Sequence, residues 1–272
     1  ESATAFGCLM SDLWLGEFDY VSPEAFHSVF GKRYLTFSTR TQQDAQEFLM
    51  CVLEELHQAF REVRAQLRHL GEASAEASRG SGSGTSIITQ LFEGQLSYSI
   101  TCLKCKTITD RPESFTVLSL PIPSGRVCAL EDCLDCFFQP DTLTQNNQIH
   151  CCWCGTNQDA TVKATITRAP QIIIFHLKRF AWQDRHRRKL STTVCYPFSN
   201  LDLSPYSSRF FYKNAAYSLC ALVNHTGDID YGHYTAFCKH STTKHWYSFD
   251  DTQVTKISDS AVQTDTAYLL FY

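Results

Sequence analysis

The chain has 272 residues, of which 43% are hydrophobic and 19% charged, and its formal net charge at pH 7 is −4. This composition is typical of a globular protein with one large domain or two ordinary ones, and it excludes a disordered chain. The acidic balance argues against a nucleic-acid-binding protein, and apolar runs no longer than a strand argue against a membrane protein. No secretory signal is recognisable, so the thirteen cysteines are expected to be reduced thiols or metal ligands in the cytoplasm or nucleus.

Residues 1–70 are predicted to be helical. From Gln42 to Leu67, apolar residues recur at the spacing of one helix face. Thr41 and Asp44 have the spacing of a capping box, so this helix is expected to begin at Thr41.

The amino-acid composition changes after the helical part. Small and polar residues fill 71–86, which predicts a flexible Gly/Ser linker. Beyond it the chain turns to short strand-like segments separated by Pro, Gly and Asn. In residues 171–180, apolar side chains occur at both odd and even positions. This predicts a central strand that is buried on both faces of its sheet.

Two CxxC pairs stand in the strand-rich part, Cys102 with Cys105 and Cys151 with Cys154. A CxxC turn directs two thiolates to one point, and two such turns complete a tetrahedral shell for Zn²⁺. Four protein ligands leave no open coordination position, so one such zinc per chain would be structural. His150 and Cys152 crowd the second pair and leave its choice of ligands open, and unligated reduced cysteines are the alternative.

The alternating segments 232–239 and 245–250 flank a short polar stretch, which predicts a β-hairpin. Opposite residues of a hairpin have position numbers with a constant sum, which places His233 opposite Asp250 within about one residue. An imidazole–carboxylate hydrogen bond is then within reach. The pair is either the base and its orienting group from a nucleophilic triad or an ordinary surface ion pair.

Several short boxes follow one another along the chain. They are Gln43-Asp-Ala-Gln-Glu-Phe48, Gln90-Leu-Phe-Glu-Gly-Gln95, the two CxxC pairs, Leu118-Ser-Leu-Pro121, Pro170 through Phe180, Tyr231-Gly-His-Tyr234, Trp246-Tyr-Ser-Phe-Asp-Asp251 and Ala267-Tyr-Leu-Leu-Phe-Tyr272. In content and order these boxes resemble the catalytic domain of the ubiquitin-specific proteases, which are papain-like cysteine peptidases. The resemblance covers residues 43–272.

The resemblance implies an α+β fold shaped like a hand. Residues 1–70 would form a helical thumb, and the linker 71–86 would follow it. Residues 87–160 would form fingers with a zinc ribbon, including a palm segment near 118–127. Residues 161–272 would form an antiparallel sheet palm that carries the histidine and the aspartate.

The family hydrolyses the (iso)peptide bond after the C-terminal glycine of ubiquitin by thiol chemistry. The resemblance implies that His233 is the general base and that Asp250 accepts a hydrogen bond from its ring Nδ1–H. Asp251 would help to position the oxyanion or the water. Relatives also carry Asn at the Asp250 position, which accepts the same hydrogen bond.

Four residues fall where the family binds the basic tail of ubiquitin: Asp44, Glu47, Tyr231 and Gly232. Asp44 and Glu47 are three apart and share one helix face, so two carboxylates converge on one arginine-sized partner. Their other reading is a pair of acids that favour the helix N-terminus. Tyr231 replaces a glycine common in relatives, and Gly232 keeps the backbone approach open.

One element of the family pattern does not occur in these 272 residues. The nucleophile box, similar to Gly-Asn-Thr-Cys-Tyr-Met-Asn, is absent, and neither Cys8 nor Cys238 has its context. The sequence therefore predicts either a deubiquitinase domain that is inactive as given or a pseudo-enzyme that binds ubiquitin or a ubiquitin-like protein without cleavage. Expected partners are ubiquitin and ubiquitinated proteins, not nucleic acid or membrane, and the chain is expected to be a monomer.

Overall fold

The computed structural model describes residues 1–39, 41–69, 84–183, 186–208, 216–228 and 231–272. Contacts divide these residues into two units. The first contains residues 1–91 with Tyr231 and Gly232, and the second contains the described residues of 92–228 and 233–272. Most of the predicted linker, residues 71–83, lies outside the described residues. No described helix is long and apolar enough to cross a membrane.

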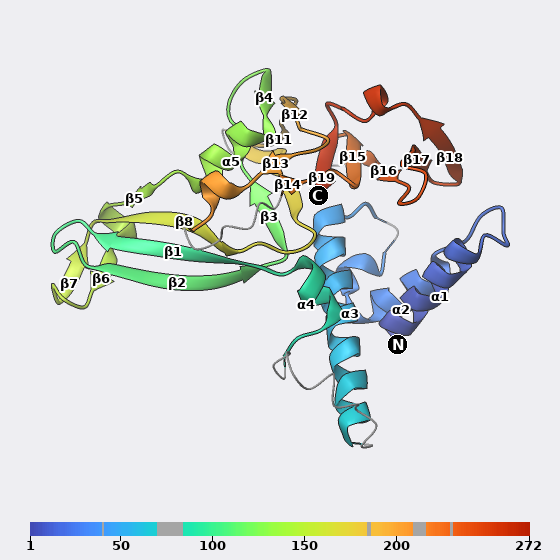
Figure 1. Cartoon of the computed structure of the whole chain (residues 1–272), viewed down its shortest axis with the longest axis horizontal. Coiled ribbons are helices and arrows are strands. Elements are labelled where there is room, and N and C mark those ends of the chain that lie inside the picture. The colour runs from blue at the N-terminus through green and yellow to red at the C-terminus, as the bar shows by residue number, and fades with distance from the viewer. Residues whose placement is uncertain (40, 70–83, 184–185, 209–215, 229–230) are drawn as a thin grey trace. The chain divides into compact units, whose positions relative to one another are not determined.

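The first unit is helical, as predicted for residues 1–70. Its elements are α1 (Ser2–Leu15), α2 (Glu24–Arg33), the 3-10 helix Leu35–Phe37, α3 (Ala45–His69) and α4 (Ile87–Phe92). Helices α1 to α3 carry the blue end of the colour scale (Figure 1). Phe26, Phe30 and Phe37 are buried between these helices, and the Phe48 ring of α3 packs edge-on against all three. Aromatic burial of this kind stabilises the unit.

Helix α3 begins at Ala45, so the predicted start at Thr41 is wrong. Oδ1 of Asp44 accepts hydrogen bonds from the backbone N–H groups of Gln46 at 2.7 Å and Glu47 at 3.1 Å. Asp44 is therefore the N-cap, because its side chain satisfies two amides that have no partner within the helix.

The second unit is built mainly of strands. Its larger sheet has the order β18-β17-β16-β15-β19-β9-β3 among the described residues. These strands are β3 (Val117–Leu120), β9 (Ile174–Leu177), β15 (Ala221–Gly227), β16 (Gly232–Lys239), β17 (Trp246–Asp250), β18 (Gln253–Ile257) and β19 (Ala267–Phe271). Strand β3 runs parallel to β9, and β9 runs antiparallel to β19.

The predicted central strand at 171–180 is confirmed with shorter bounds, as β9. Ile174, Phe175 and Leu177 have no exposed surface, in agreement with burial on both faces. The strand ends before Arg179, whose buried guanidinium donates hydrogen bonds to the carbonyls of Ala267, Leu190 and Thr192. Three backbone acceptors hold this side chain, so the chain leaves the sheet there.

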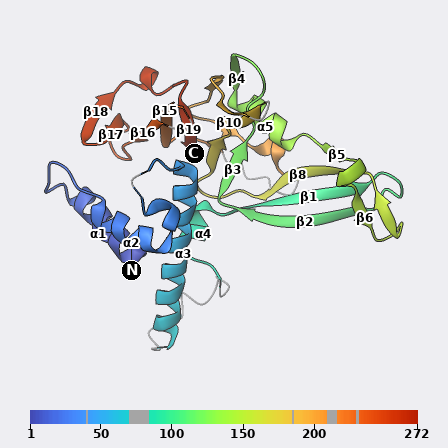
Figure 2. The same cartoon turned by 180° about the vertical axis from the view of Figure 1, so that it is seen from behind.

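A second sheet has the order β2-β1-β8-β5. Its strands are β1 (Gly94–Cys102), β2 (Ile108–Phe115), β5 (Asp141–Leu143) and β8 (Ala160–Arg168), and the small hairpin of β6 (Ile149–Cys151) and β7 (Thr156–Gln158) follows β5 in the chain. Both views show β1, β2 and β8 side by side along their length (Figure 1, Figure 2). Together they present both CxxC pairs at one end.

Shorter elements complete the second unit. They are β4 (Val127–Ala129), α5 (Leu130–Phe138), the 3-10 helix Gln145–Asn147, β10 (Phe180–Gln183), β11 (His186–Lys189), β12 (Thr193–Cys195), β13 (Leu201–Asp202), the 3-10 helix Ser204–Tyr206, β14 (Ala216–Tyr217) and the 3-10 helix Asp259–Ala261. The predicted α+β class is confirmed.

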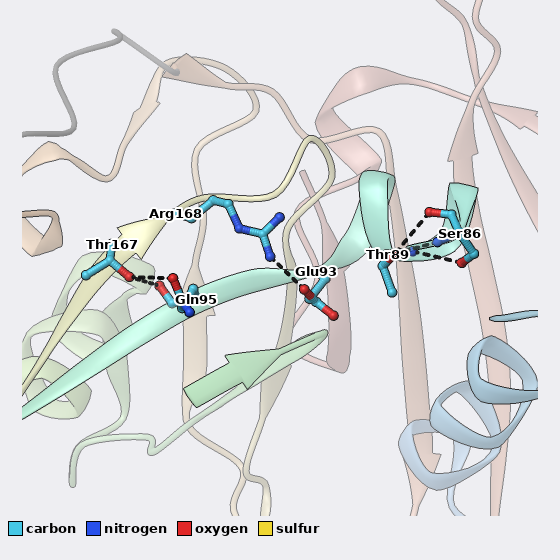
Figure 3. Close-up of polar contacts among 6 residues, drawn as sticks. All are labelled: Ser86, Thr89, Glu93, Gln95, Thr167 and Arg168. Atoms are coloured by element: carbon cyan, nitrogen blue, oxygen red, sulfur yellow. Dashed lines mark hydrogen bonds and ion pairs between the residues drawn. The ribbon is translucent and has the colours of Figure 1, made fainter. Parts of the chain in front are cut away.

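Strands β1 and β8 shift register where they meet the rest of the second unit. Gln95 pairs with Arg168, whereas the next residue pairs with Ile166, so Thr167 is the extra residue of a β-bulge. The Thr167 hydroxyl donates to the Gln95 carbonyl at 3.2 Å, and Nη2 of Arg168 contacts Oε1 of Glu93 at 2.6 Å (Figure 3). These side chains hold the irregular end of the ladder in place.

Candidate active site and metal centre

His233 and Asp250 form a direct hydrogen bond, as predicted. Nε2 of His233 lies 2.6 Å from Oδ1 of Asp250. His233 lies on β16 and Asp250 at the end of β17, which are neighbours in the larger sheet. Both side chains are about half exposed, with 47% and 53% of their surface accessible. The pair can therefore exchange protons with a group that arrives from solvent.

Two details of the predicted pair are wrong. In the observed register Ala236 pairs with Phe249, so a continued ladder would place Asp250 opposite Thr235 rather than His233. His233 is thus the diagonal neighbour of Asp250 on the same face, which long side chains can still bridge. The ring must reach farther along this diagonal, and it uses its distal nitrogen, Nε2, instead of the expected Nδ1.

Asp251 completes the acidic surroundings of the ring. It occupies the turn between β17 and β18 with φ 46°, a left-handed conformation that Asp tolerates. His233, Asp250 and Asp251 each place one ligand-type atom within 4.8 Å of the others. The hydrogen bond to Asp250 is the main cause that raises the pKa of His233; desolvation opposes it, and the negative charges of Asp250 and Asp251 add smaller upward contributions.

We expect Asp250→Asn to lower the pKa of His233, because the amide oxygen can still accept a hydrogen bond but carries no charge to stabilise the imidazolium. A raised folded-state pKa means that this pair stabilises the fold below the ordinary histidine pKa and that the contribution is lost as pH rises through the raised value. NMR titration of His233 checks the shift, and Asp259→Asn is a matched control. An unchanged pKa in Asp250→Asn would show that the contact is absent in solution.

Two side chains that the sequence analysis did not assign to this site contact the backbone around His233. The Gln42 amide forms two hydrogen bonds with the backbone of Gly232, and the Thr226 hydroxyl donates to the carbonyl of His233 at 3.3 Å. No sequence signal links positions 42 and 232. Both contacts follow from tertiary structure alone.

The four predicted tail-binding residues all belong to the first unit. Asp44 and Glu47 lie at the start of α3, where Asp44 also serves as the N-cap. Tyr231 is 69% exposed and precedes Gly232. The structure therefore supports the helix-capping reading of Asp44, and tail binding stays a prediction for all four.

Among the described residues, no cysteine sulfur of the second unit hydrogen-bonds the His233 ring. Cys238 lies on β16, and burial raises the pKa of its thiol, with a further contribution from Cys220. A raised pKa disfavours the reactive thiolate.

The two CxxC pairs converge, as predicted. The sulfurs of Cys102, Cys105, Cys151 and Cys154 all lie within 4.8 Å of one another, and those of Cys105 and Cys151 are 3.5 Å apart. Tetrahedral coordination with Zn–S bonds of about 2.3 Å separates sulfurs by roughly 3.8 Å, so the cluster has the size of a metal shell. Cys152 is exposed and stands outside the set, which resolves the ambiguity of the second pair.

Both CxxC turns have the same backbone geometry. The N–H of Lys106 donates to the carbonyl of Cys102, and the N–H of Gly155 donates to the carbonyl of Cys151, each at 2.9 Å. Lys106 and Gly155 are left-handed, with φ 61° and 65°. Glycine adopts this conformation readily, whereas lysine does so at a cost that the surrounding structure must offset.

The pKa values of two thiols in the cluster shift in opposite directions. Hydrogen bonding with Thr107 lowers the pKa of Cys105 to about 6. Burial and hydrogen bonds with the other three thiols raise the pKa of Cys154 to about 12. Four thiolates at this spacing repel one another unless a positive ion lies between them, so the donor set fits a bound metal.

Known proteins resemble this chain over its whole length. Residues 2–272 match the family described as "Ubiquitin carboxyl-terminal hydrolase". Ubiquitin carboxyl-terminal hydrolase 2 of Gallus gallus is 37% identical over 281 residues, which cover 98% of this chain and 78% of that protein. The human protein of the same name is 35% identical, over 98% of this chain and 46% of its own length.

Solved structures show the same fold. A chain of the SAGA Ubp8/Sgf11/Sus1/Sgf73 DUB module bound to ubiquitin aldehyde has a TM-score of 0.72 and 29% identity, and the match covers 91% of this chain and 52% of that chain. A related structure of the module is bound to monoubiquitin, also with a TM-score of 0.72. The chain spans about half of these longer chains. By its sequence match, its fold and its histidine–aspartate pair, the protein belongs to the ubiquitin carboxyl-terminal hydrolase family and has the α+β fold of a ubiquitin-specific protease catalytic domain.

Proposed function

We propose that this domain binds the C-terminal tail of ubiquitin and carries the base half of a cysteine-type deubiquitinase site. The observation that carries the proposal is the hydrogen bond of 2.6 Å between His233 and Asp250, in a chain whose relatives are ubiquitin carboxyl-terminal hydrolases.

We infer a chemical role for each member of the pair. Asp250 holds the ring through Nε2 and stabilises the imidazolium, which its effect on the His233 pKa supports. Within the described residues Nδ1 of His233 has no hydrogen-bond partner, so this nitrogen is available to take the proton of a thiol and return it to the leaving amine. Asp251, close to both, would help to position the oxyanion or the water.

Tail binding rests on acidic and backbone groups of the first unit. Glu47 and Asp44 offer carboxylates to the basic tail, and charge-assisted hydrogen bonds to arginine are strong and directional. Tyr231 and Gly232 precede the base directly in the chain. A tail that ends in glycines can approach a backbone closely because it has no side chains.

We expect the 272-residue chain to bind monoubiquitin without cleaving a ubiquitin C-terminal amide, because no residue in these 272 has the context of the nucleophile. NMR titration should shift the amide signals of Glu47, Tyr231 and Gly232. Ubiquitin without its C-terminal tail is the matched control, and its binding should be much weaker. Steady cleavage that Cys8→Ala or Cys238→Ala abolishes would show that this chain has a nucleophile of its own.

We also propose that the four-cysteine cluster holds one structural Zn²⁺. Four thiolates fit zinc better than harder metals, and a full set of protein ligands leaves no position for a substrate. When bound, the ion would cross-link the β1–β2 hairpin to the β6–β7 hairpin. It would take no part in the reaction at His233.

We propose a reducing compartment as the cellular setting of this protein. Thirteen cysteines with no disulfide among the described residues support a reducing compartment, the cytoplasm or the nucleus. The partners we propose are ubiquitin and ubiquitinated proteins. The expected monomeric state stays a prediction.

A further inference from the structure

The side chain of Gln42 pairs with the backbone of Gly232 through two hydrogen bonds. Its Nε2 donates to the carbonyl of Gly232, and the N–H of Gly232 donates to its Oε1, both at 2.6 Å. A flipped amide would set donor against donor and acceptor against acceptor, so the two contacts fix its orientation. Gln42 itself stands two residues before Asp44, the cap of the 25-residue helix α3.

These hydrogen bonds act on the peptide group that leads into His233. The carbonyl of Gly232 belongs to the peptide unit that joins it to His233, and this planar unit includes the Cα atom of His233. Fixing the carbonyl oxygen therefore fixes the plane from which the histidine side chain projects. Gly232 has no Cβ to restrict its own backbone and stands at the first position of β16, so the two hydrogen bonds from Gln42 add a restraint at the end of the strand.

The peptide group that follows His233 is held as well. Oγ1 of Thr226, on the neighbouring strand β15, donates to the carbonyl of His233 at 3.3 Å. Side chains thus hold the peptide planes on both sides of the histidine. With its backbone fixed, the ring needs only its own two torsions to reach Asp250.

We propose that Gln42 and Thr226 are positioning residues for His233. The inference rests on the proposed role of His233 as general base. Neither side chain contacts the reacting atoms. Both hold the backbone so that Nε2 of the ring stays on the carboxylate of Asp250 and Nδ1 stays free to accept the proton of a thiol. If Gln42 is lost, the Gly232–His233 peptide plane can rotate, and the ring should leave Asp250 for part of the time.

The test is the state of the His233 ring in the 272-residue chain, followed by NMR. In the unmodified chain we expect a downfield Nε2–H proton signal shared with Asp250 and a His233 pKa above the ordinary histidine value. Gln42→Ala should broaden or remove this signal and shift the pKa downward. Gln43→Ala is the matched control, because among the described residues the amide of Gln43 donates to the nearby Thr41 hydroxyl and not to the backbone around His233, and it should leave both readouts unchanged.

A pair of substitutions at Thr226 gives a second, independent measurement. Thr226→Val keeps the shape but removes the hydroxyl donor, and it should move the same two readouts in the same direction. Thr226→Ser keeps the donor and should restore them. Gln42→Glu keeps the acceptor for the Gly232 N–H but loses the donor, so its effect should fall between those of Gln42→Ala and the unmodified chain.

The outcomes separate positioning from a purely structural role. If Gln42→Ala and Thr226→Val lower the melting temperature but leave the His233 pKa and ring signal unchanged, the positioning role is wrong. These readouts need no ubiquitin and no turnover. A chain that fails to bind ubiquitin would overturn the proposed function while leaving the positioning result intact.

Discussion

Cys154→Ser is expected to abolish stoichiometric zinc and to unfold the end of the chain's second sheet. Cys154 is one of four sulfurs within 4.8 Å of one another. Zinc binding provides about 10–16 kcal/mol of folding free energy in isolated zinc fingers, so loss of one ligand should lower the free energy of unfolding by more than about 3 kcal/mol. In a domain of this size that corresponds to a fall in melting temperature of roughly 6–12 °C.

The chain offers a closely matched control for this experiment. Cys152 lies two residues away, between the ligands of the second CxxC pair, but it is exposed and outside the cluster. Cys152→Ser should retain one zinc per chain by elemental analysis and an unchanged melting temperature. Purified unmodified protein with no stoichiometric zinc, or equal losses in Cys152→Ser and Cys154→Ser, would contradict the assignment.

The second large effect is expected in ubiquitin binding when the acids at the start of α3 lose their charge. Because Asp44 is the N-cap of α3, Asp44→Ala would confuse loss of binding with loss of the cap. Asparagine caps helices as well as aspartate, so Asp44→Asn removes the charge and keeps the helix start. Glu47→Gln is the corresponding change at the exposed partner position.

Each substitution should weaken ubiquitin binding roughly 5- to 10-fold, and the double variant more, because charge-assisted hydrogen bonds to arginine contribute about 1–1.4 kcal/mol more than neutral ones. Affinity of the unmodified chain should also fall with salt, and this dependence should be shallower in the variants. Glu62→Gln makes the same charge change about 20 Å farther along α3 and should have little effect. Equal affinities for the three single variants, measured calorimetrically, would remove tail binding from Asp44 and Glu47.

Local sequence was enough to predict the features of this protein that depend on residues close together in the chain. The CxxC spacing predicted four converging thiols because each turn brings its own two sulfurs together, and the structure bears this out. Helical periodicity predicted α3, and apolar residues at both parities predicted the doubly buried strand β9. The histidine–aspartate contact was also predictable, because a short hairpin loop restricts which residues of two adjacent strands can meet.

Other features were decided by tertiary structure. In the observed hairpin register, Asp250 falls opposite Thr235 rather than His233. His233 is therefore the diagonal neighbour of Asp250, and its Nε2 rather than its Nδ1 contacts the carboxylate. The start of α3 shifted from Thr41 to Ala45, since Asp44 could serve equally well as a cap or as a third-position acid, and local spacing does not separate these roles.

The pairing of Gln42 with Gly232 shows most clearly what the sequence alone cannot predict. The two residues are separated by 190 positions, and neither has a pattern that marks it for the other. A glutamine amide can pair with any exposed peptide group, so its partner is chosen only when the folded chain brings one peptide group within reach. Sequence thus predicted which groups of this domain would carry its chemistry, and the tertiary structure decided what contacts them, because a hydrogen bond between distant residues depends on the path of the whole chain between them.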